Sequence, residues 1–225
     1  MAKFISSKNR DIYTALIRPS LQLPIGFEKL CLEYPIPYNK VADIFKLAHL
    51  CVNDTFTRCF QYKVLCQTLP TKEYLFKYKV PDIVNNQCKR CNLERDTIEH
   101  CLFDCEKIQP FLNLIKDLIQ SVHGLTLNRE SIIFGSYQFV TKNKGINHFL
   151  LELKKFIFYT LQDDFDNQPI LLLKRFLTRM RFLIVKEKEI AIRKDKFDSF
   201  AKKWKPFCNI IYNFYGPDNT DFFFK

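Results

Sequence analysis

Four residues of metal-binding type occur within 18 positions near the middle of this 225-residue chain. They are Cys88, Cys91, His100 and Cys105, with the spacing C-x2-C-x8-H-x4-C. Zinc prefers four such ligands in a tetrahedron, and two cysteines at this spacing can both reach one ion from a tight turn. We therefore predict one structural Zn²⁺ site, in a zinc knuckle that holds the middle third of the chain together.

The geometry of the last two ligands sets a condition on the local fold. On a continuous α-helix, His100 and Cys105 would point about 140° apart, so we expect Cys105 at or beyond the end of a short helix. Three thiolates and one Zn²⁺ give a site of net charge −1 with no open coordination position, which excludes catalysis at the metal. Cys101 is the local competitor for a ligand role, but adjacent residues rarely face one ion. The alternative is that these are four unrelated residues in a chain with nine cysteines.

Apolar residues recur at helical spacing through most of the chain, which predicts a mostly α fold. Cap residues at Asn39, Asp54 and Thr71 mark three helix starts, and Asp96 begins a sequence typical of a capping box. Further helices are expected over 11–18, 108–122, 147–161 and from Pro169 to about Lys205, with a turn at 163–168. Residues 131–135 fit either a short strand or a buried segment. We divide the chain into an N-terminal helical part (1–80), a zinc-binding segment with its following helix (81–125) and a C-terminal helical part (126–225), or read it as one continuous module.

The net charge of +11, from 35 Lys and Arg against 24 Asp and Glu, favours a polyanionic partner. No window holds the ~18 uninterrupted apolar residues of a membrane span, and the first residues contain no apolar signal sequence. We therefore expect an intracellular protein, in the nucleus or the cytoplasm, that does not associate with membranes.

Most of the positive charge lies in residues 170–205, which contain 12 basic and 4 acidic residues. Basic side chains at helical spacing can follow a phosphate backbone. The candidate nucleic-acid contacts are Lys89, Arg90, Arg175, Arg179, Arg181, Lys186, Arg193, Lys194, Lys202 and Lys203. Four aromatic residues, Tyr62, Tyr74, Tyr78 and Trp204, can in principle stack on unpaired bases, although their helical spacing favours a place in the core. The alternative for the charge is an ordinary solvated face.

Two sequence segments flank the predicted zinc ligands and carry a family resemblance. They are FQYKVLCQTLPTK at 60–72 and TIEHCLFDC at 97–105. These segments resemble the zinc-binding region at the C-terminus of LINE-type (non-LTR) retrotransposon reverse transcriptases, and weaker similarity extends over 11–207. The resemblance implies binding to template RNA or target DNA, and a contact with the polymerase part of a related protein.

The enzymatic motifs of that family are not found in this sequence. The nearest match to the polymerase carboxylates is Gln162-Asp163-Asp164, which we interpret as a solvated turn, and Pro81-Asp82 precedes the zinc ligands instead of following them. The histidines outside the cluster are isolated in sequence. We predict a non-catalytic, zinc-containing module that binds nucleic acid through a basic face. The alternative is a zinc-supported protein-interaction or scaffold module with an acidic partner.

Overall fold

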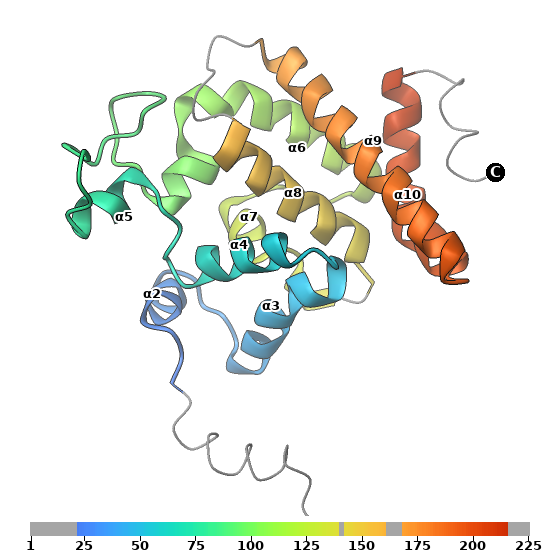
Figure 1. Ribbon diagram of the computed structural model, residues 1–225, viewed down its shortest axis with the longest axis horizontal. Helices are drawn as coiled ribbons and strands as arrows, with labels where there is room; N and C mark the ends of the chain where they lie inside the picture. Colours follow the sequence, from blue (N-terminus) through green and yellow to red (C-terminus); the bar gives the residue numbers. More distant parts are fainter. Residues whose placement is uncertain (1–21, 140–141, 161–167, 216–225) are drawn as a thin grey trace, which may run out of the picture.

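The computed structural model describes residues 22–139, 142–160 and 168–215, and these residues form a helical protein (Figure 1). No strand occurs within those ranges; Gln87 and Arg95 form an isolated antiparallel bridge. The mostly α fold class is thus confirmed. The elements are α2 (Ile25–Glu33), α3 (Tyr38–Cys51), α4 (Thr55–Leu65), α5 (Lys72–Lys77), the π-helix η2 (His100–Asp104), the 3-10 helix η3 (Glu106–Ile108), α6 (Gln109–His123), α7 (Arg129–Phe134), the 3-10 helix η4 (Tyr137–Phe139), α8 (Lys144–Thr160), α9 (Pro169–Arg193) and α10 (Phe197–Tyr215).

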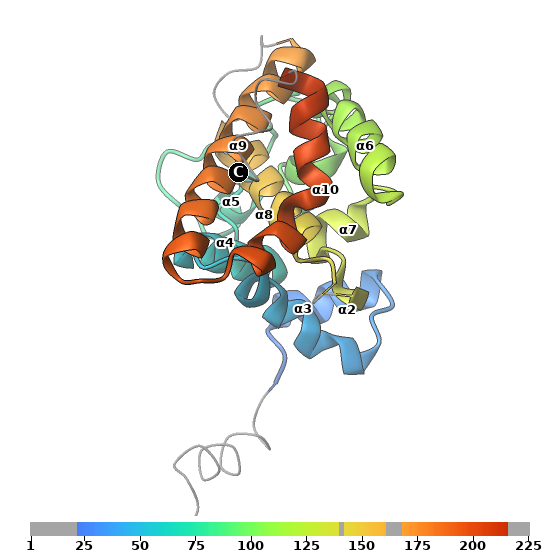
Figure 2. The same cartoon turned by 90° about the vertical axis from the view of Figure 1, so that its right-hand side faces the viewer.

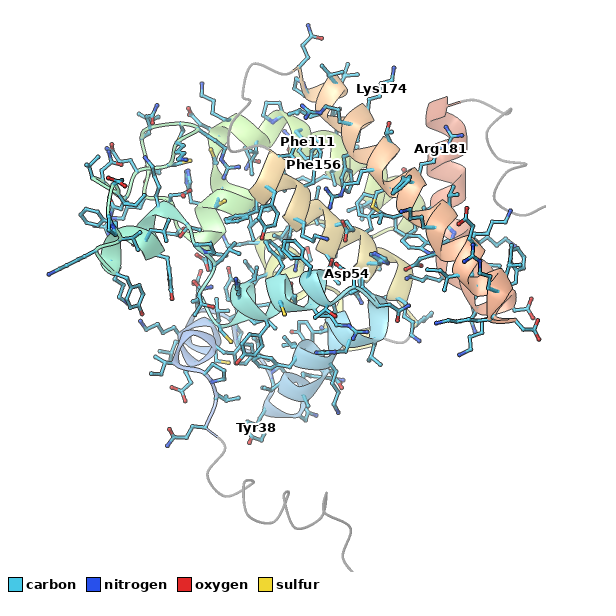
Figure 3. All side chains as sticks on the ribbon, viewed as in Figure 1. Tyr38, Asp54, Phe111, Phe156, Lys174 and Arg181 are labelled. Carbon is cyan, nitrogen blue, oxygen red and sulfur yellow. The ribbon has the colours of Figure 1, made fainter. Side chains whose placement is uncertain are left out.

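Helix α8 forms the centre of the core. All of its residues from 145 to 158 are buried, and it packs against α3, α4, α9, α10 and η2. Phe156 of α8 meets Phe111 of α6 with ring centroids 5.7 Å apart, and both rings lie at the middle of the molecule in Figure 3. On the far side of the core, α10 lies between α9 and α6 (Figure 2). Five of its enclosed residues are polar or charged, so their side chains must find hydrogen-bond partners within the protein: Asn147, His148, Glu152, Lys154 and Lys155.

Several predicted helix ends are confirmed by their caps. Asp54 and Thr71 are the N-caps of α4 and α5, and Gly124 ends α6 in a left-handed conformation with φ +61°. The predicted cap Asn39 is wrong: Pro37 is the N-cap of α3, which begins at Tyr38, and Asn39 lies within the helix. The ambiguous segment 131–135 is mostly helix α7, whose N-terminus carries a capping box formed by Asn128 and Ser131. The helix predicted over 11–18 and residues 163–167 of the predicted turn lie outside the described residues, and Gln168 is the N-cap of α9.

Two predicted boundaries are wrong, each for a local reason. Helix α8 begins at Lys144 instead of Asn147, because the buried Asn147 amide accepts from the Ser136 N–H at 2.7 Å and ties α8 to the preceding turn. The long helix expected to reach Lys205 ends at Arg193. Asp195 adopts a left-handed φ of +53°, and Lys196 N–H donates to the Ala191 carbonyl at 2.8 Å.

This pattern is a Schellman motif without its usual glycine. Asp195 N–H also donates to the Ile192 carbonyl at 3.1 Å, which is the second hydrogen bond of the motif. The reversal lets α10 fold back along α9 and bury Phe200, Trp204 and Phe207. No glycine or proline marks this turn, so the sequence contains no strong signal for it.

Replacing Asp54 with alanine is expected to lower the free energy of unfolding by about 1–2 kcal/mol. The Asp54 carboxylate, labelled in Figure 3, accepts from the backbone N–H groups of Phe56 at 3.2 Å and Thr57 at 2.8 Å. The loss is measured by urea unfolding. Asp43→Ala is the matched control, because Asp43 makes a surface ion pair with Lys40 at 3.7 Å, and such pairs contribute less than about 1 kcal/mol. Equal losses in the two variants would contradict the capping role.

Candidate metal centre

The first two ligands are held by a tight loop, residues 85–96, which we call the knuckle loop. The Cys88 N–H donates to the Glu94 carbonyl at 2.8 Å, and the Asn92 N–H donates to the Cys88 carbonyl at 2.9 Å. Asn92 turns the chain with a left-handed φ of +56°, a conformation that asparagine tolerates better than most residues. The loop therefore folds Cys88 and Cys91 towards one point, as the C-x2-C spacing predicts.

The other two ligands are brought together by the π-helix η2. The Cys105 N–H donates to the His100 carbonyl at 3.0 Å, an i→i+5 bond of the wider π-turn. A π-turn contains one residue more than an α-turn, so His100 and Cys105, which are five residues apart, lie on nearly the same side of it. The angular separation that an α-helix would impose on them is thereby removed. Cys105 directly follows the helix, so the expectation that it lies at or beyond a short helix end is confirmed.

The expected capping role of Asp96 is wrong. Thr97 caps this turn instead, accepting from the His100 N–H at 3.0 Å through its hydroxyl. Asp96 is buried and its carboxylate accepts from the Lys72 N–H at 2.8 Å. Asp96 thereby ties the start of α5 to the knuckle loop.

The four predicted ligands converge on one point. Cys88 Sγ lies 3.9 Å from Cys105 Sγ, and Cys91 Sγ lies 3.4 Å from His100 Nε2. All four ligand atoms lie within 4.8 Å of one another. A tetrahedron with Zn–S of about 2.3 Å and Zn–N of about 2.0–2.1 Å has edges of about 3.8 Å and 3.6 Å. The Cys3His cluster can thus hold a metal ion with little movement.

The electrostatics of the cluster favour a thiolate at Cys88 and a neutral thiol at Cys101. A hydrogen bond from Cys105, with backbone N–H groups of Cys91 and Arg90, lowers the pKa of Cys88. Burial raises the pKa of Cys101 to about 12. The hydrogen bond to Cys88 and burial raise the pKa of Cys105 as well. The exclusion of Cys101 therefore rests on geometry, because the ligand atoms that lie within 4.8 Å of one another belong to Cys88, Cys91, His100 and Cys105.

Arg90 is buried beside the cluster, although it was a candidate nucleic-acid contact. Its guanidinium donates to the Cys101 carbonyl, and its side chain is 8% exposed. Burial by itself would lower the pKa of Arg90, but the nearby Cys101, Cys105 and Cys88 raise it. A positive charge here offsets the −1 charge of a metal-loaded Cys3His site. Its buried position indicates that Arg90 stabilises the metal centre and does not contact a nucleic acid at the surface.

Two more candidate contacts form ion pairs with carboxylates of other helices, although the Arg179 side chain stays 40% exposed. Arg179 pairs with the buried Glu152 of α8 at 3.1 Å. The Lys203 ammonium bonds Glu187 at 2.9 Å and the Cys51 carbonyl at 2.8 Å. Arg181 is partly exposed, and the remaining candidates are exposed: Lys89, Arg175, Lys186, Arg193, Lys194 and Lys202.

The aromatic candidates divide into two groups. Trp204 is fully buried, as its spacing predicts, and its indole N–H donates to Glu187 at 2.6 Å. Tyr62 and Tyr78 are 55% and 60% exposed, so the expectation that they lie in the core is wrong. On α4, Phe60, Val64 and Leu65 supply the apolar contacts to the core, which leaves Tyr62 at the surface. Tyr78 follows α5, a helix with no buried residue.

Comparison of the chain with protein-family models, with curated proteins and with solved structures finds no match in any of the three. The resemblance to LINE reverse transcriptases therefore stays a hypothesis based on residues 60–72 and 97–105. None of the helices within 22–139, 142–160 and 168–215 is long and apolar enough to span a bilayer.

Proposed function

We propose that this protein is a non-catalytic nucleic-acid-binding module stapled by one structural Zn²⁺. The observation that carries the proposal is the surface charge of residues 170–205. Eight of the twelve basic side chains in that segment are exposed, against three exposed acidic side chains. The exposed basic residues are Lys174, Arg175, Lys186, Arg193, Lys194, Lys196, Lys202 and Lys205.

The exposed cations of α9 form an elongated surface, which we call the α9 basic face: Lys174, Arg175, Lys186, Arg193 and the following Lys194. Lys174 and Arg181 mark the course of α9 in Figure 3. A row of lysines and arginines along a rigid helix suits the regularly spaced charges of a phosphate backbone. RNA and DNA share this chemistry, and we propose that the partner is one or both of them.

The metal centre has a structural role in this proposal. Three cysteines and one histidine fill the four positions of tetrahedral Zn²⁺ and leave none for substrate. The similarity of residues 60–72 and 97–105 to a LINE reverse transcriptase C-terminus supports the same function, with the polymerase part of a related protein as a further partner. Such a module acts inside the cell, in the nucleus or the cytoplasm.

Reversing two charges of the α9 basic face tests the proposal. Arg175→Glu together with Lys186→Glu is expected to weaken binding of a fluorescent RNA hairpin or DNA duplex about ten-fold or more. The slope of log K against log salt is expected to fall by about 2, because two phosphate contacts are lost. Fluorescence anisotropy at several salt concentrations measures both quantities.

The matched control reverses the same number of exposed basic residues elsewhere. Lys46→Glu with Lys142→Glu changes the net charge equally, on α3 and just before α8. An unchanged salt slope in this control assigns the effect to α9. Equal losses in both double variants would instead indicate a response to net charge alone.

A protein partner is the second candidate function. Phe182, Ile190 and Ile192 on α9 are 57%, 45% and 56% exposed beside the cations, and the Lys186 ammonium lies 4.4 Å from the Phe182 ring centroid. A mixed apolar and basic surface suits an acidic protein partner. Absence of RNA and DNA binding at low salt, with retained binding to an acidic protein, favours this alternative.

A further inference from the structure

A groove with a volume of about 630 Å³ lies beside the metal centre. Helices α2 and α5, which line it, lie on the opposite side of the molecule from α10 in Figure 1. Its walls are α2, the end of α4, α5 and residues 97–99, directly before the ligand His100. The lining residues that matter here are Lys29, Tyr62, Tyr74, Lys77 and Tyr78. We call this the tyrosine groove.

Three tyrosines line this groove, and none of them is buried. Tyr74 and Tyr78 lie with ring centroids 4.7 Å apart, and Tyr74 is half-buried. Tyr62 faces the groove from α4 and is more than half exposed. Exposed, closely spaced aromatic rings are the platform on which unpaired bases stack.

The charges around the tyrosine groove suit a strand whose bases point inward. Lys29 and Lys77 reach it from α2 and α5, and the Lys77 ammonium lies 5.7 Å from the Tyr78 ring centroid. Of its three glutamates, Glu33 pairs with Arg129 at 3.5 Å and Glu99 accepts from the Gln67 amide at 3.0 Å. The groove is therefore close to neutral where uncharged bases would lie.

The flanking chain supplies the positive charge for a phosphate backbone. Residues 72–96, which run from α5 through the knuckle loop, contain six basic and four acidic residues, and one of the acidic residues, Asp96, is buried. Of the six basic residues, Lys77, Lys79, Lys89 and Arg95 are exposed. This excess of cations beside an aromatic groove is complementary to a single-stranded nucleic acid and not to a neutral peptide.

The knuckle loop of the metal centre fixes the position of helix α5, which forms one wall of the tyrosine groove. Helix α5 has six residues and none of them is buried. Its start is fixed to the knuckle loop by the Lys72 N–H bond to Asp96 and by the Lys72 ammonium, which donates to the Asn85 side chain at 3.3 Å. The tyrosine groove is thus preorganised by the same loop that holds Cys88 and Cys91.

We propose that the tyrosine groove binds a single-stranded segment of nucleic acid. Bases stack on Tyr62 and on the Tyr74–Tyr78 pair, while phosphates face Lys29 and Lys77. This inference rests on the proposed nucleic-acid function and adds strand selectivity and a second contact surface, separate from the α9 basic face.

Two tyrosine substitutions test the groove. Tyr62→Ala with Tyr78→Ala is expected to weaken binding of fluorescent 12-nucleotide oligo-dT and oligo-U about ten-fold or more, since each base–aromatic stack is lost on alanine substitution. Affinity for a 12-base-pair duplex is expected to stay unchanged, because its bases are already stacked. Tyr38→Ala is the matched control: Tyr38 is 85% exposed on α3, where Figure 3 labels it, and its loss is expected to change neither affinity.

The outcomes separate this inference from the proposed function. If the double tyrosine variant binds single strands as tightly as the unmodified protein does, the groove assignment is overturned. The groove would then suit a peptide segment instead. Equal losses for strand and duplex also overturn it. If the tyrosine variant binds normally while Arg175→Glu with Lys186→Glu does not, the α9 basic face stands and the groove alone fails. Absence of binding to strand and duplex by the unmodified, zinc-loaded protein overturns both proposals.

Discussion

Replacing Cys88 with serine is expected to abolish binding of one zinc ion per chain and to lower the melting temperature by about 10 °C or more. Cys88 is fully buried, and its sulfur lies 3.9 Å from that of Cys105. Structural zinc contributes about 10–16 kcal/mol in isolated finger peptides. Each kcal/mol shifts the melting temperature by about 2–4 °C at this chain length, so losing even half of that contribution gives a large effect.

The zinc content of purified protein and a circular dichroism melt measure this result. Two serine variants serve as controls. Cys59→Ser removes an exposed cysteine of α4 and is expected to change neither the zinc content nor the melting temperature. Cys101→Ser is expected to retain one zinc ion, because the ligand cluster consists of the other four residues. A Cys88→Ser protein that still binds one zinc, or an unmodified protein that binds none, would contradict the metal assignment.

The ligand set was predictable because each part of its spacing has a direct geometric meaning. Two cysteines two residues apart require only a tight turn, and the knuckle loop provides one. The π-turn at His100 was not predictable, although the angular mismatch with Cys105 showed that a regular helix could not continue. Whether the chain forms a π-turn here depends on how η2 packs against α8 and α6. Short-range sequence patterns contain no information on that packing.

The basic residues show a different limit of sequence reasoning. Those up to Arg193 lie on one helix as predicted, whereas Lys194 and Lys196 lie in the turn before α10. The sequence could not show which basic side chains meet a carboxylate from another helix. Arg179 lies 27 residues from its partner Glu152, and Lys203 lies 16 residues from Glu187. The same limit applies to Tyr62 and Tyr78, because helical spacing alone does not identify which aromatic rings the neighbouring helices cover.

Replacing the buried Lys154 with methionine is expected to stabilise the protein at neutral pH by about 2–4 kcal/mol. The Lys154 ammonium is fully buried in α8, where it donates to the Gln61 side-chain oxygen and to the Ile133 carbonyl. Both partners are neutral, and burial lowers the pKa of Lys154 to about 7. One pKa unit corresponds to about 1.4 kcal/mol. Part of the gain is offset because the Gln61 oxygen loses its donor.

The pH dependence of this gain has a defined sign. Between pH ~7 and ~10.4, the unfolded chain holds a proton on Lys154 that the folded protein has released, so the stability of the unmodified protein rises with pH in that window. Below pH ~7 the lysine is charged in both states and its burial has the full cost. The advantage of Lys154→Met should therefore be largest at pH 6 and should shrink steadily towards pH 10, as measured by urea unfolding at several pH values.

The neighbouring Lys155 provides the control, because its ammonium meets carboxylates, including that of Asp54 at 3.7 Å, where Lys154 meets neutral groups. Its ammonium is also buried, but it bonds the Glu152 carboxylate at 3.0 Å and the Thr57 hydroxyl at 2.6 Å. Lys155→Met leaves a buried carboxylate with one cation fewer and is expected to destabilise the protein. The two variants are expected to change the stability in opposite directions, because the partners of Lys154 are neutral and those of Lys155 include a carboxylate. A pH-independent effect of Lys154→Met, or a loss of stability at pH 6, would show that this lysine is not buried among neutral groups.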